Sequence, residues 1–280
     1  MLPQSSCCLY LHHPLYPFKP EVNNIKEKMK KKLILVLSLG LNDFKSKYKG
    51  SALGALWAVA EPLATVAVYW FVYTMAVGGQ GGDIPYYLWL SVGIAPWFFI
   101  SEGIRSVTVC YRDYSFLLKK TPIDKSTLPT ARMFSAFISH LIFLTIVIVL
   151  CIIEGKLKIH LPSFCAFGVL SMMLVWSVGS ITAVLCAKHK GVANAVGIVL
   201  NAGFWLTPVF WNVGGLDSTI SKLVMLNPAA IIVEGYRYAI LYGKGADLRG
   251  IAYLLTICAL FAGIGYFFKK RELPYISDSL

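Results

Sequence analysis

The middle of the chain holds the stretch that decides the fold. Residues 130–153 have the sequence TARMFSAFISHLIFLTIVIVLCII. A helix needs roughly 20 apolar residues to cross the hydrocarbon core of a bilayer. This run is long enough, and we expect it to be a transmembrane helix.

Five further apolar runs of similar length lie on either side of it. They cover residues 55–77, 86–109, 162–187, 192–211 and 251–268. Over all 280 residues, 57% are hydrophobic and 14% are charged, whereas a soluble domain has about 25% charged residues. Because backbone groups in a bilayer need partners within the protein, these runs predict an all-α polytopic membrane protein with six transmembrane helices.

Basic residues gather beside these runs and set the expected orientation. Residues 1–49 hold nine lysines against three acids, and the stretches 111–126, 188–190 and 269–271 are basic too. Cytoplasmic loops carry an excess of Lys and Arg, so both termini are predicted to be cytoplasmic. The net charge of +12 then reflects topology, and we expect no nucleic-acid partner.

The two ends of the chain differ from its centre. Residues 1–28 include four prolines and are expected to form a poorly structured extension, with Met29 as an alternative start. Residues 29–54 combine lysines with an apolar stretch too short to span a bilayer, which indicates an amphipathic helix on the cytoplasmic surface. Residues 55–270 then form the transmembrane domain, and residues 271–280 a cytoplasmic tail.

A more polar segment separates the fifth run from the sixth. It contains Asn227-Pro228 and then an apolar stretch interrupted by Glu234 and Arg237. Such a segment is tolerated at membrane depth where it is buried in protein or lines a watery cavity, so we predict short helices that re-enter from outside. Glu234 and Arg237, spaced i,i+3, form either a structural ion pair or an outer gate.

The sequence offers no catalytic chemistry. Walker, G-x-S-x-G and H-E-x-x-H patterns do not occur in it. Cys7, Cys8, His12 and His13 lack the paired spacing of a metal site. We therefore expect no catalytic residue, cofactor or metal in this chain, and no enzyme activity of its own. An ion-coupled secondary transporter or a membrane enzyme is the alternative, which inverted repeats or acidic relays within the spans would favour.

Residues 48–63 make the chain resemble a known family. They have the sequence YKGSALGALWAVAEPL, which is similar to the opening motif of permeases from ABC exporters of O-antigen, capsule and teichoic-acid precursors. The matching positions are Lys47, Tyr48, Ser51, Leu53, Gly54, Trp57, Pro62 and Leu63. Further similar segments are GIAPWFFISE (93–102), LLKKTPIDKSTLP (117–129), LTPVFW (206–211) and LNPAAIIVEGYRYAI (226–240).

The resemblance implies a function that the composition alone does not give. It implies a homodimer in the bacterial cytoplasmic membrane, docked to a separate nucleotide-binding ATPase subunit, that exports undecaprenyl-linked polysaccharide. A permease for a drug or another lipid is the alternative within the same architecture, because fold does not fix substrate.

The resemblance also implies where the ATPase docks. In these permeases the loop after the second span is a coupling helix, and residues 111–124 take its place here. The candidate coupling residues are Arg112, Asp113, Lys119 and Lys120. The alternative is an ordinary basic loop. Ile123-Asp124 stands where the family usually has an aromatic residue and proline, and AKHKGV (187–192) stands where Arg-Asp is common.

Two further groups are candidates for contact with a lipid-linked glycan. Lys45, Lys47, Tyr48 and Lys49 flank the first span, where they can meet an anionic lipid head group or simply anchor the helix. Tyr69, Tyr73, Trp97, Phe98 and Phe99 can line a glycan conduit, since sugar rings stack on aromatic faces, or form interfacial belts.

Other polar residues lie inside or near the spans. Glu61, Glu102 and Arg105 are functional candidates because charge is costly in hydrocarbon. Glu102 and Arg105, spaced i,i+3, alternatively pair with each other. His140 is expected to make a packing contact or a hydrogen bond between helices.

Overall fold

A computed structural model describes residues 25–49, 54–77, 83–120, 123–215 and 217–272, and the regular elements in this part of the chain are helices. The α-helices are α1 (Ile25–Tyr48), α2 (Trp57–Val77), α3 (Tyr86–Asp113), α4 (Ser115–Lys120), α5 (Thr127–Ile153), α6 (Leu161–Lys188), α7 (Gly191–Leu206), α8 (Ser218–Val224), α9 (Pro228–Ile240) and α10 (Leu248–Glu272). Two 3₁₀ turns, Gly54–Leu56 and Val213–Gly215, complete the set.

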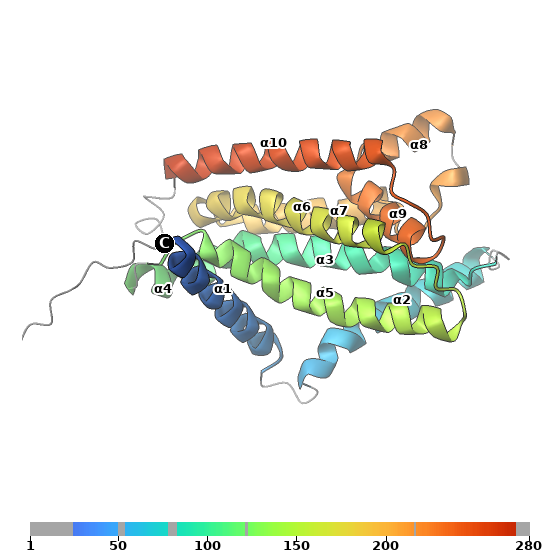
Figure 1. The fold of residues 1–280 in the computed structure, drawn as a ribbon, viewed down its shortest axis with the longest axis horizontal. Coiled ribbons are helices and arrows are strands. Elements are labelled where there is room, and N and C mark those ends of the chain that lie inside the picture. The colour runs from blue at the N-terminus through green and yellow to red at the C-terminus, as the bar shows by residue number, and fades with distance from the viewer. Residues whose placement is uncertain (1–24, 50–53, 78–82, 121–122, 216, 273–280) are drawn as a thin grey trace, which may run out of the picture.

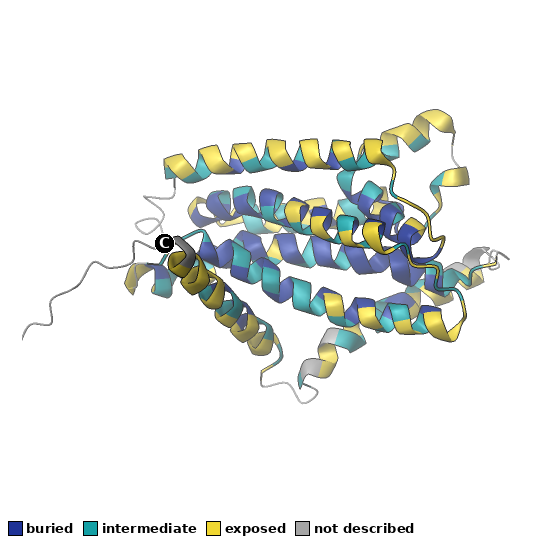
Figure 2. Cartoon of the chain, viewed as in Figure 1, coloured by how far each residue is buried: buried dark blue, intermediate teal, exposed yellow. Residues whose placement is uncertain are grey.

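Four long helices form the body of the molecule. Figure 1 shows α3, α5, α6 and α10 running nearly parallel, with α1 crossing obliquely at the end where α4 lies and α8 at the opposite end. α3 packs on α5, α6 and α9 and buries most of its residues, so it is mainly dark blue in Figure 2. α10 packs on α6 and is mainly yellow there, with Leu254, Cys258 and Gly265 as its buried residues.

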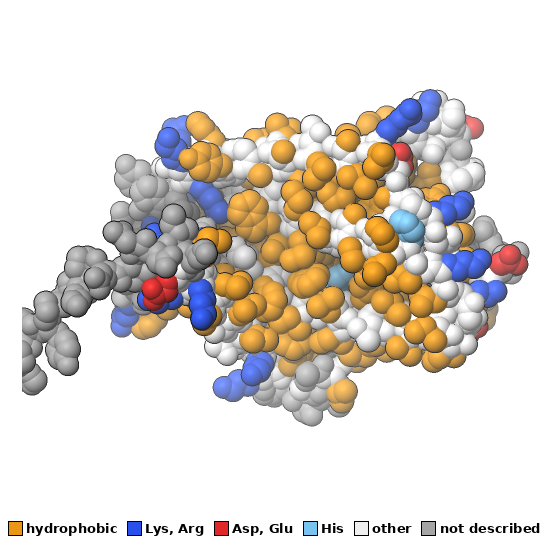
Figure 3. All heavy atoms as spheres, viewed as in Figure 1, with side chains coloured by type: hydrophobic (Ala, Val, Ile, Leu, Met, Phe, Trp, Pro, Cys, Tyr) orange, Lys and Arg blue, Asp and Glu red, His pale blue; other side chains and the backbone are white. Residues whose placement is uncertain are grey.

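The long helices match the apolar runs. In the described part of the chain, α3, α5, α6 and α10 are long and apolar enough to cross a membrane, and residues 59–72 of α2 and the whole of α7 are shorter apolar helices. Figure 3 shows a broad hydrophobic band on the visible face, with Lys and Arg side chains toward the two ends of the bundle. This is the distribution expected of a protein whose middle faces lipid.

The fifth predicted span ends earlier than expected. The apolar run predicted a helix over 192–211, but α7 ends at Leu206 and Thr207 is extended, with φ −93° and ψ 138°. Pro208 explains this, because proline removes a backbone donor and disfavours helical geometry in the residue before it. Thr207, Pro208 and Val209 are nevertheless buried, so a non-helical strip of backbone lies inside the bundle.

α1 occupies the place of the predicted amphipathic helix. It covers Ile25–Tyr48, whereas the sequence predicted a helix over 29–54. It packs on α5 so closely that a Cβ at Gly40 would lie 2.8 Å from the carbonyl oxygen of Ala131. Leu33, Ile34 and Leu41 remain exposed on it. The predicted extension up to residue 24 and the tail from residue 273 lie outside the described residues.

The polar segment before the last long helix contains two short helices, as its sequence suggested. α9 is the buried one of the two and packs on α3 and α6. A Cβ at Gly235 would overlap the ring of Phe167, which shows how closely α9 approaches α6. Asn227 caps α9, with its side-chain oxygen accepting a hydrogen bond from the Ala229 backbone N–H at 3.0 Å.

Candidate functional site

The short helix α4 presents a mixed surface beside the end of α3. Leu118 is buried and fixes α4 to the core, while Phe116, Lys119 and Lys120 are exposed. The Lys120 Nζ lies 4.2 Å from the centroid of the Phe116 ring. Aromatic residues are enriched at protein interfaces, and the two lysines beside this ring give the surface of α4 a positive charge.

Two of the predicted coupling residues lie in a different position. Arg112 is half-buried at the end of α3, and Asp113 is exposed but paired. The Asp113 Oδ2 lies 2.6 Å from Nη2 of Arg132, on α5. The structure therefore brings Lys119 and Lys120 together on α4 and directs Asp113 toward the bundle.

Arg132 is the centre of a charged cluster that the sequence did not single out. Its Nη1 lies 3.0 Å from Oδ1 of Asp43 on α1, and its guanidinium lies 4.9 Å from the ring centroid of Tyr114, next to α4. The cluster of Asp43, Asp113, Tyr114 and Arg132 thus joins α1, the end of α3, α5 and the start of α4. A lone arginine inside an apolar run was the available signal for it.

This cluster is not fully hydrogen-bonded. Nε of Arg132 and Oδ2 of Asp43 are buried and have no hydrogen-bond partner among the described residues. Buried polar atoms are normally satisfied, so each exception needs an explanation. A buried donor and a buried acceptor without partners in one cluster leave room for a second pairing of the same side chains.

A second contact ties the other end of α1 to the loop after α4. Lys32 donates to Oδ2 of Asp124 at 2.6 Å and to Oγ of Ser126 at 2.8 Å. Burial raises the pKa of the Asp124 carboxyl, but the hydrogen bonds from Lys32 and Ser126 outweigh this and lower the pKa below its usual value. The contact is exposed and contributes at most about 1 kcal/mol.

A cavity of about 450 Å³ lies between α1, α2, α3 and α5, and we call it the four-helix cavity. Its polar lining consists of Lys47, Tyr48, Glu61, Ser101, Glu102, Arg105, Ser139 and His140. Phe98 and Phe99 line it as well. The structure therefore joins two of the predicted head-group residues to two of the predicted conduit aromatics. Lys45 and Lys49 are exposed and are not among its lining residues.

Charged side chains in the four-helix cavity are partly paired. The i,i+3 spacing suggested that Glu102 pairs with Arg105. Instead, Oε1 of Glu102 lies 2.5 Å from Nζ of Lys47, so Glu102 pairs with α1. Arg105 donates from Nη2 to Oδ1 of Asn201 on α7 at 2.7 Å. Lys47, Glu102, Arg105 and Arg132 also line a neighbouring cavity of about 380 Å³, so the Arg132 cluster and the four-helix cavity adjoin.

The remaining predicted aromatics lie elsewhere. Tyr69 packs against Phe204 and Phe210, with ring centroids 5.4 and 6.3 Å apart, and Trp97 packs on Phe204 at 5.9 Å. Trp97 is buried and Tyr69 is half-buried. The side chain of Tyr73 lies outside the described residues. The predicted aromatics thus divide between the four-helix cavity and a cluster formed by α2, α3 and α7.

His140 makes the interhelical contacts expected of it. It is buried, with Nδ1 3.2 Å from the Ala95 carbonyl oxygen and Nε2 3.2 Å from the hydroxyl of Tyr236. Its ring stacks on Phe99 with centroids 5.0 Å apart. His140 therefore links α5 to α3 and α9, and the prediction of a helix-to-helix hydrogen bond is confirmed.

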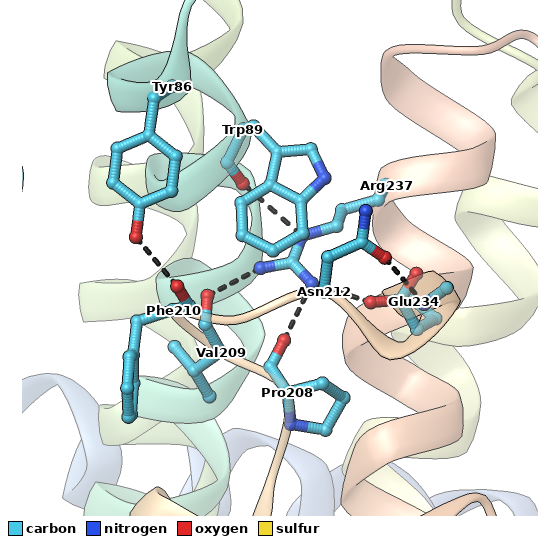
Figure 4. A network of polar contacts seen from close by, with 9 residues as sticks. Tyr86, Trp89, Pro208, Val209, Phe210, Asn212, Glu234 and Arg237 are labelled. Atoms are coloured by element: carbon cyan, nitrogen blue, oxygen red, sulfur yellow. Dashed lines mark hydrogen bonds and ion pairs between the residues drawn. The ribbon is translucent and has the colours of Figure 1, made fainter. Parts of the chain in front are cut away.

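Glu234 and Arg237 form the predicted ion pair, with Nη1 and Oε1 2.6 Å apart. Arg237 is fully buried, and Figure 4 shows its guanidinium directed at the non-helical backbone after α7. Nη1 donates to the Pro208 carbonyl at 2.6 Å, Nη2 to the Val209 carbonyl at 2.5 Å, and Nε to the Trp89 carbonyl at 3.3 Å. A Cβ at Gly93 would overlap this guanidinium.

These hydrogen bonds explain how the strip after α7 is tolerated inside the bundle. Because α7 stops before the proline, the carbonyls of the strip after it receive no hydrogen bonds from a continuing helix and need other donors. Arg237 donates to the Pro208 and Val209 carbonyls, and the Tyr86 hydroxyl donates to the Phe210 carbonyl at 2.7 Å. Asn227 donates to the hydroxyl Oγ1 of Thr207 at 2.8 Å. The local sequence predicted the ion pair, but these carbonyl partners depend on tertiary packing.

Groups of three or more His, Cys, Asp or Glu side chains that would hold a metal ion are absent from the described residues. Cys7, Cys8, His12 and His13 lie outside them. The side chains described above offer ion pairs, aromatic rings and exposed lysines.

Comparison with known proteins identifies the family. A family described as ABC-2 type transporter matches residues 35–241, which run from α1 to the residue after α9 and include both arginine clusters. The chain belongs to the ABC-2 type transporter family. It is a multi-pass membrane permease of a family whose members carry no ATPase domain of their own.

Curated relatives of this ABC-2 permease match along nearly their whole length. The O-antigen export system permease protein RfbA of Myxococcus xanthus is 23% identical over 85% of this chain and 93% of its own. A protein with the same description from Klebsiella pneumoniae is 22% identical over 85% and 92%. The polysialic acid transport protein KpsM of Escherichia coli is 23% identical over 85% and 94%.

Proposed function

We propose that this ABC-2 permease exports lipid-linked polysaccharide of the O-antigen or capsular kind across a bacterial cytoplasmic membrane. The observation that carries the proposal is the near full-length similarity to permeases whose descriptions state O-antigen export and polysialic acid transport. A glycan carried on a lipid diphosphate presents an anionic head group and a chain of sugar rings, and the candidate site offers cations and aromatic rings together.

In this proposal the chain spans the membrane six times. The spans are α2, α3, α5, α6, α7 and α10, with the non-helical strip 207–210 completing the short α7. The end of the bundle with α4 faces the cytoplasm, because Lys119, Lys120, Lys188 and the basic run at the end of α10 gather there. Both termini are then cytoplasmic, and α8 and α9 belong to the outer half.

The ATPase subunit docks on α4 in this arrangement. Phe116, Lys119 and Lys120 form the exposed contact surface, and buried Leu118 holds the helix in place. Asp113 and Tyr114 connect this surface to Arg132 and through it to Asp43 on α1. Movement of α4 driven by the ATPase therefore reaches α1, whose last residues line the four-helix cavity.

The four-helix cavity receives the lipid head group. Lys47 and Arg105 supply the positive charge, and Glu102 holds Lys47 until an anionic ligand replaces its carboxylate. The half-buried Phe98 provides a stacking face for the first sugar, and the buried Phe99 supports the cavity wall behind it. Glu234 and Arg237 keep the outer strip in place, so that an opening at the outer end moves the strip and α9 together.

A second copy of the chain completes the conduit. Large apolar side chains are exposed on α2 and α7, including Trp70, Phe71, Ile198 and Trp205. Tyr69 and Trp97 pack just beneath this surface, against Phe204. Two copies facing each other through α2 and α7 would place these aromatic clusters on either side of the path.

Affinity purification from the native membrane in a mild detergent tests the proposal. We expect a Walker-containing ATPase and a lipid-linked glycan to purify with the chain. Recovery of the ATPase with a different lipid or a drug would overturn the glycan assignment and make that molecule the exported substrate. Recovery of neither partner would overturn the exporter assignment.

Reversing the charge of the α4 surface tests the docking site. Lys119→Glu with Lys120→Glu should abolish recovery of the ATPase, because both lysines are exposed on the proposed contact. Lys28→Glu with Lys30→Glu makes the same change of charge on the exposed face of α1 and should leave recovery unchanged. Equal recovery of the ATPase with both variants would rule out α4 as the docking helix.

A further inference from the structure

A slot of about 430 Å³ separates α6 from α10 near the end of the bundle where α4 lies. The two helices run side by side in Figure 1, and α10 contributes few buried residues to their contact. The residues that line the slot are different from those that line the four-helix cavity and its neighbour. The slot is therefore separate from the candidate site described above.

Small residues keep the slot open and apolar. Ala262 and Gly265 form its α10 wall, and the Trp176 ring lies on the α6 side. A Cβ at Gly265 would lie 3.3 Å from Cγ1 of Ile181, so a larger residue would tighten this wall. Because the outer face of α10 is exposed, the slot opens where a membrane protein meets lipid.

The cytoplasmic end of the slot is positively charged. Lys269 and Lys270 line it, and neither has a carboxylate within ion-pair distance among the described residues. Nearby acids already have partners, since Asp124 pairs with Lys32 and Glu272 pairs with Lys188. The Lys269 Nζ lies 4.9 Å from the Trp176 ring centroid, which holds its charge over the slot.

A buried hydroxyl lies deeper in the slot. Ser180 is 2% exposed, and its Oγ has no hydrogen-bond partner among the described residues. It faces Gly265, with its Cβ 3.9 Å from the position of a Cβ there. Gly265 lies one helical turn before Lys269, a rise of about 6 Å. A buried hydroxyl is costly unless it is hydrogen-bonded, so this atom points to a polar ligand atom.

We propose that the slot binds one anionic phospholipid from the cytoplasmic leaflet. Its phosphate lies between Lys269 and Lys270, its glycerol ester accepts a hydrogen bond from Ser180, and an acyl chain follows the apolar wall along α10. Basic pockets between transmembrane helices on the cytoplasmic side commonly hold such head groups. The bound lipid fastens α10 to α6. The orientation of the slot rests on the proposed function, whereas the binding itself does not depend on the exported cargo.

Native mass spectrometry of the purified chain, titrated with phosphatidylglycerol or with phosphatidylcholine of the same acyl chains, tests the proposal. We expect one phosphatidylglycerol to bind per chain in preference to phosphatidylcholine. Lys269→Gln with Lys270→Gln should weaken this binding about 30-fold, from roughly fivefold for each lysine. Lys28→Gln with Lys30→Gln removes the same charge from the exposed face of α1 and should leave the binding unchanged.

Ser180→Ala keeps the experiment decisive if the double variant does not fold. Its hydroxyl has no protein partner, so we expect unchanged yield but weaker binding of phosphatidylglycerol. Equal binding of the two lipids, or binding unaffected by either substitution, would overturn the proposal. A change in oligomeric state without loss of lipid would assign the slot to a second copy instead. Displacement of phosphatidylglycerol by equimolar undecaprenyl diphosphate would assign it to the exported lipid.

ATPase recovery measured on the same double variant separates this proposal from the proposed function. Lys269 and Lys270 are not part of the α4 surface, so the ATPase should purify with the variant as with the unmodified chain. Loss of lipid binding with the ATPase retained supports both proposals, and failure of the unmodified chain to recover an ATPase would overturn the exporter function alone.

Discussion

Two arginines at opposite ends of α3 perform different tasks in similar surroundings. Arg237 lies beside the first turns of α3, fully buried, and each of its three guanidinium nitrogens donates to an acceptor. Arg132 lies beside the last turn, between Asp43 and Asp113, and its Nε has no hydrogen-bond partner in the described part of the chain. The hydrogen-bonding capacity of the Arg237 guanidinium nitrogens is used, whereas that of Arg132 is used only in part.

This difference teaches where the permease is rigid and where it can move. Arg237 donates to the Pro208 and Val209 carbonyls, which have no donors from a helix, so the fold of the strip after α7 depends on Arg237. Arg132 joins three helices with bonds that can be exchanged, next to the helix on which we place the ATPase. After the proposed orientation, we call the Arg237 contacts the outer cluster and the Arg132 contacts the inner cluster. We expect the outer cluster to determine folding and the inner cluster to determine coupling.

The largest effect is expected from Arg237→Lys. A lysine keeps the charge beside Glu234, but it cannot reach the Trp89, Pro208 and Val209 carbonyls together. Buried carbonyls without donors cost about 1–3 kcal/mol each, so the folded protein should be largely lost. Size-exclusion chromatography of a fluorescent fusion in mild detergent measures this as the height of the monodisperse peak.

Gly93→Ala probes the same cluster from the other side. The added methyl group overlaps the Arg237 guanidinium, so the monodisperse peak should fall here too. Gly263→Ala is the matched control, because a Cβ there meets open space and alanine favours the helix. A normal peak for Gly93→Ala would show that the guanidinium does not need its present position.

The same substitution at the inner cluster should act on coupling rather than on folding. Arg132→Lys retains a cation between Asp43 and Asp113, so the chain should fold and still recover its ATPase. It cannot bind both carboxylates in the present geometry, and export should fall about tenfold, the scale of a coupling free energy between two sites. ATPase recovery and surface glycan are measured on the same cells. If Arg132→Lys lost folding as Arg237→Lys is expected to, the two clusters would not differ in their roles.

A smaller effect is expected in the four-helix cavity, which adjoins the inner cluster. Lys47→Gln removes one cation from the proposed head-group site and should lower export about fivefold without loss of folding. Glu102→Gln releases Lys47 from its ion pair and should not lower export, which makes it the matched control. Equal losses with both variants would indicate that the ion pair itself is what matters.

The smallest effect is expected from Lys32→Ala, at the far end of α1. Its contacts to Asp124 and Ser126 are exposed, and such a pair contributes at most about 1 kcal/mol. Export should stay within about twofold of the unmodified chain, as measured by surface glycan. A loss of export as large as that of Arg132→Lys would assign the coupling between α4 and α1 to Lys32 instead of Arg132.

The apolar runs predicted the helices of the transmembrane domain because hydrophobic length is a local property. The predicted end of the fifth span, at residue 211, was wrong, because the sequence remains apolar over 207–211 although α7 ends at Leu206, before Pro208. The pairing of Glu234 with Arg237 was predicted from their spacing. The sequence did not predict the contacts of Arg237 with residues 89, 208 and 209 or the ion pair of Lys47 with Glu102. These contacts join segments far apart in the chain.

The candidate site shows the same limit. Arg112, Asp113, Lys119 and Lys120 were predicted as one group. The first two lie at the end of α3, and Lys119 and Lys120 share the exposed surface of α4. The aromatics predicted as one conduit instead divide between two places, because neighbours such as Trp97 and Phe98 point to different sides of α3. Arg132 was overlooked since its partners, Asp43 and Asp113, come from two other elements.

The most direct test of the exporter function is ATP-driven transport in inverted membrane vesicles that contain the chain and its ATPase. Lipid-linked glycan added on the outer, cytoplasmic-equivalent face should become protected from a glycan-degrading enzyme when ATP is present, and Lys119→Glu with Lys120→Glu should abolish this protection. Protection without ATP, or protection that persists with the α4 variant, would contradict the account.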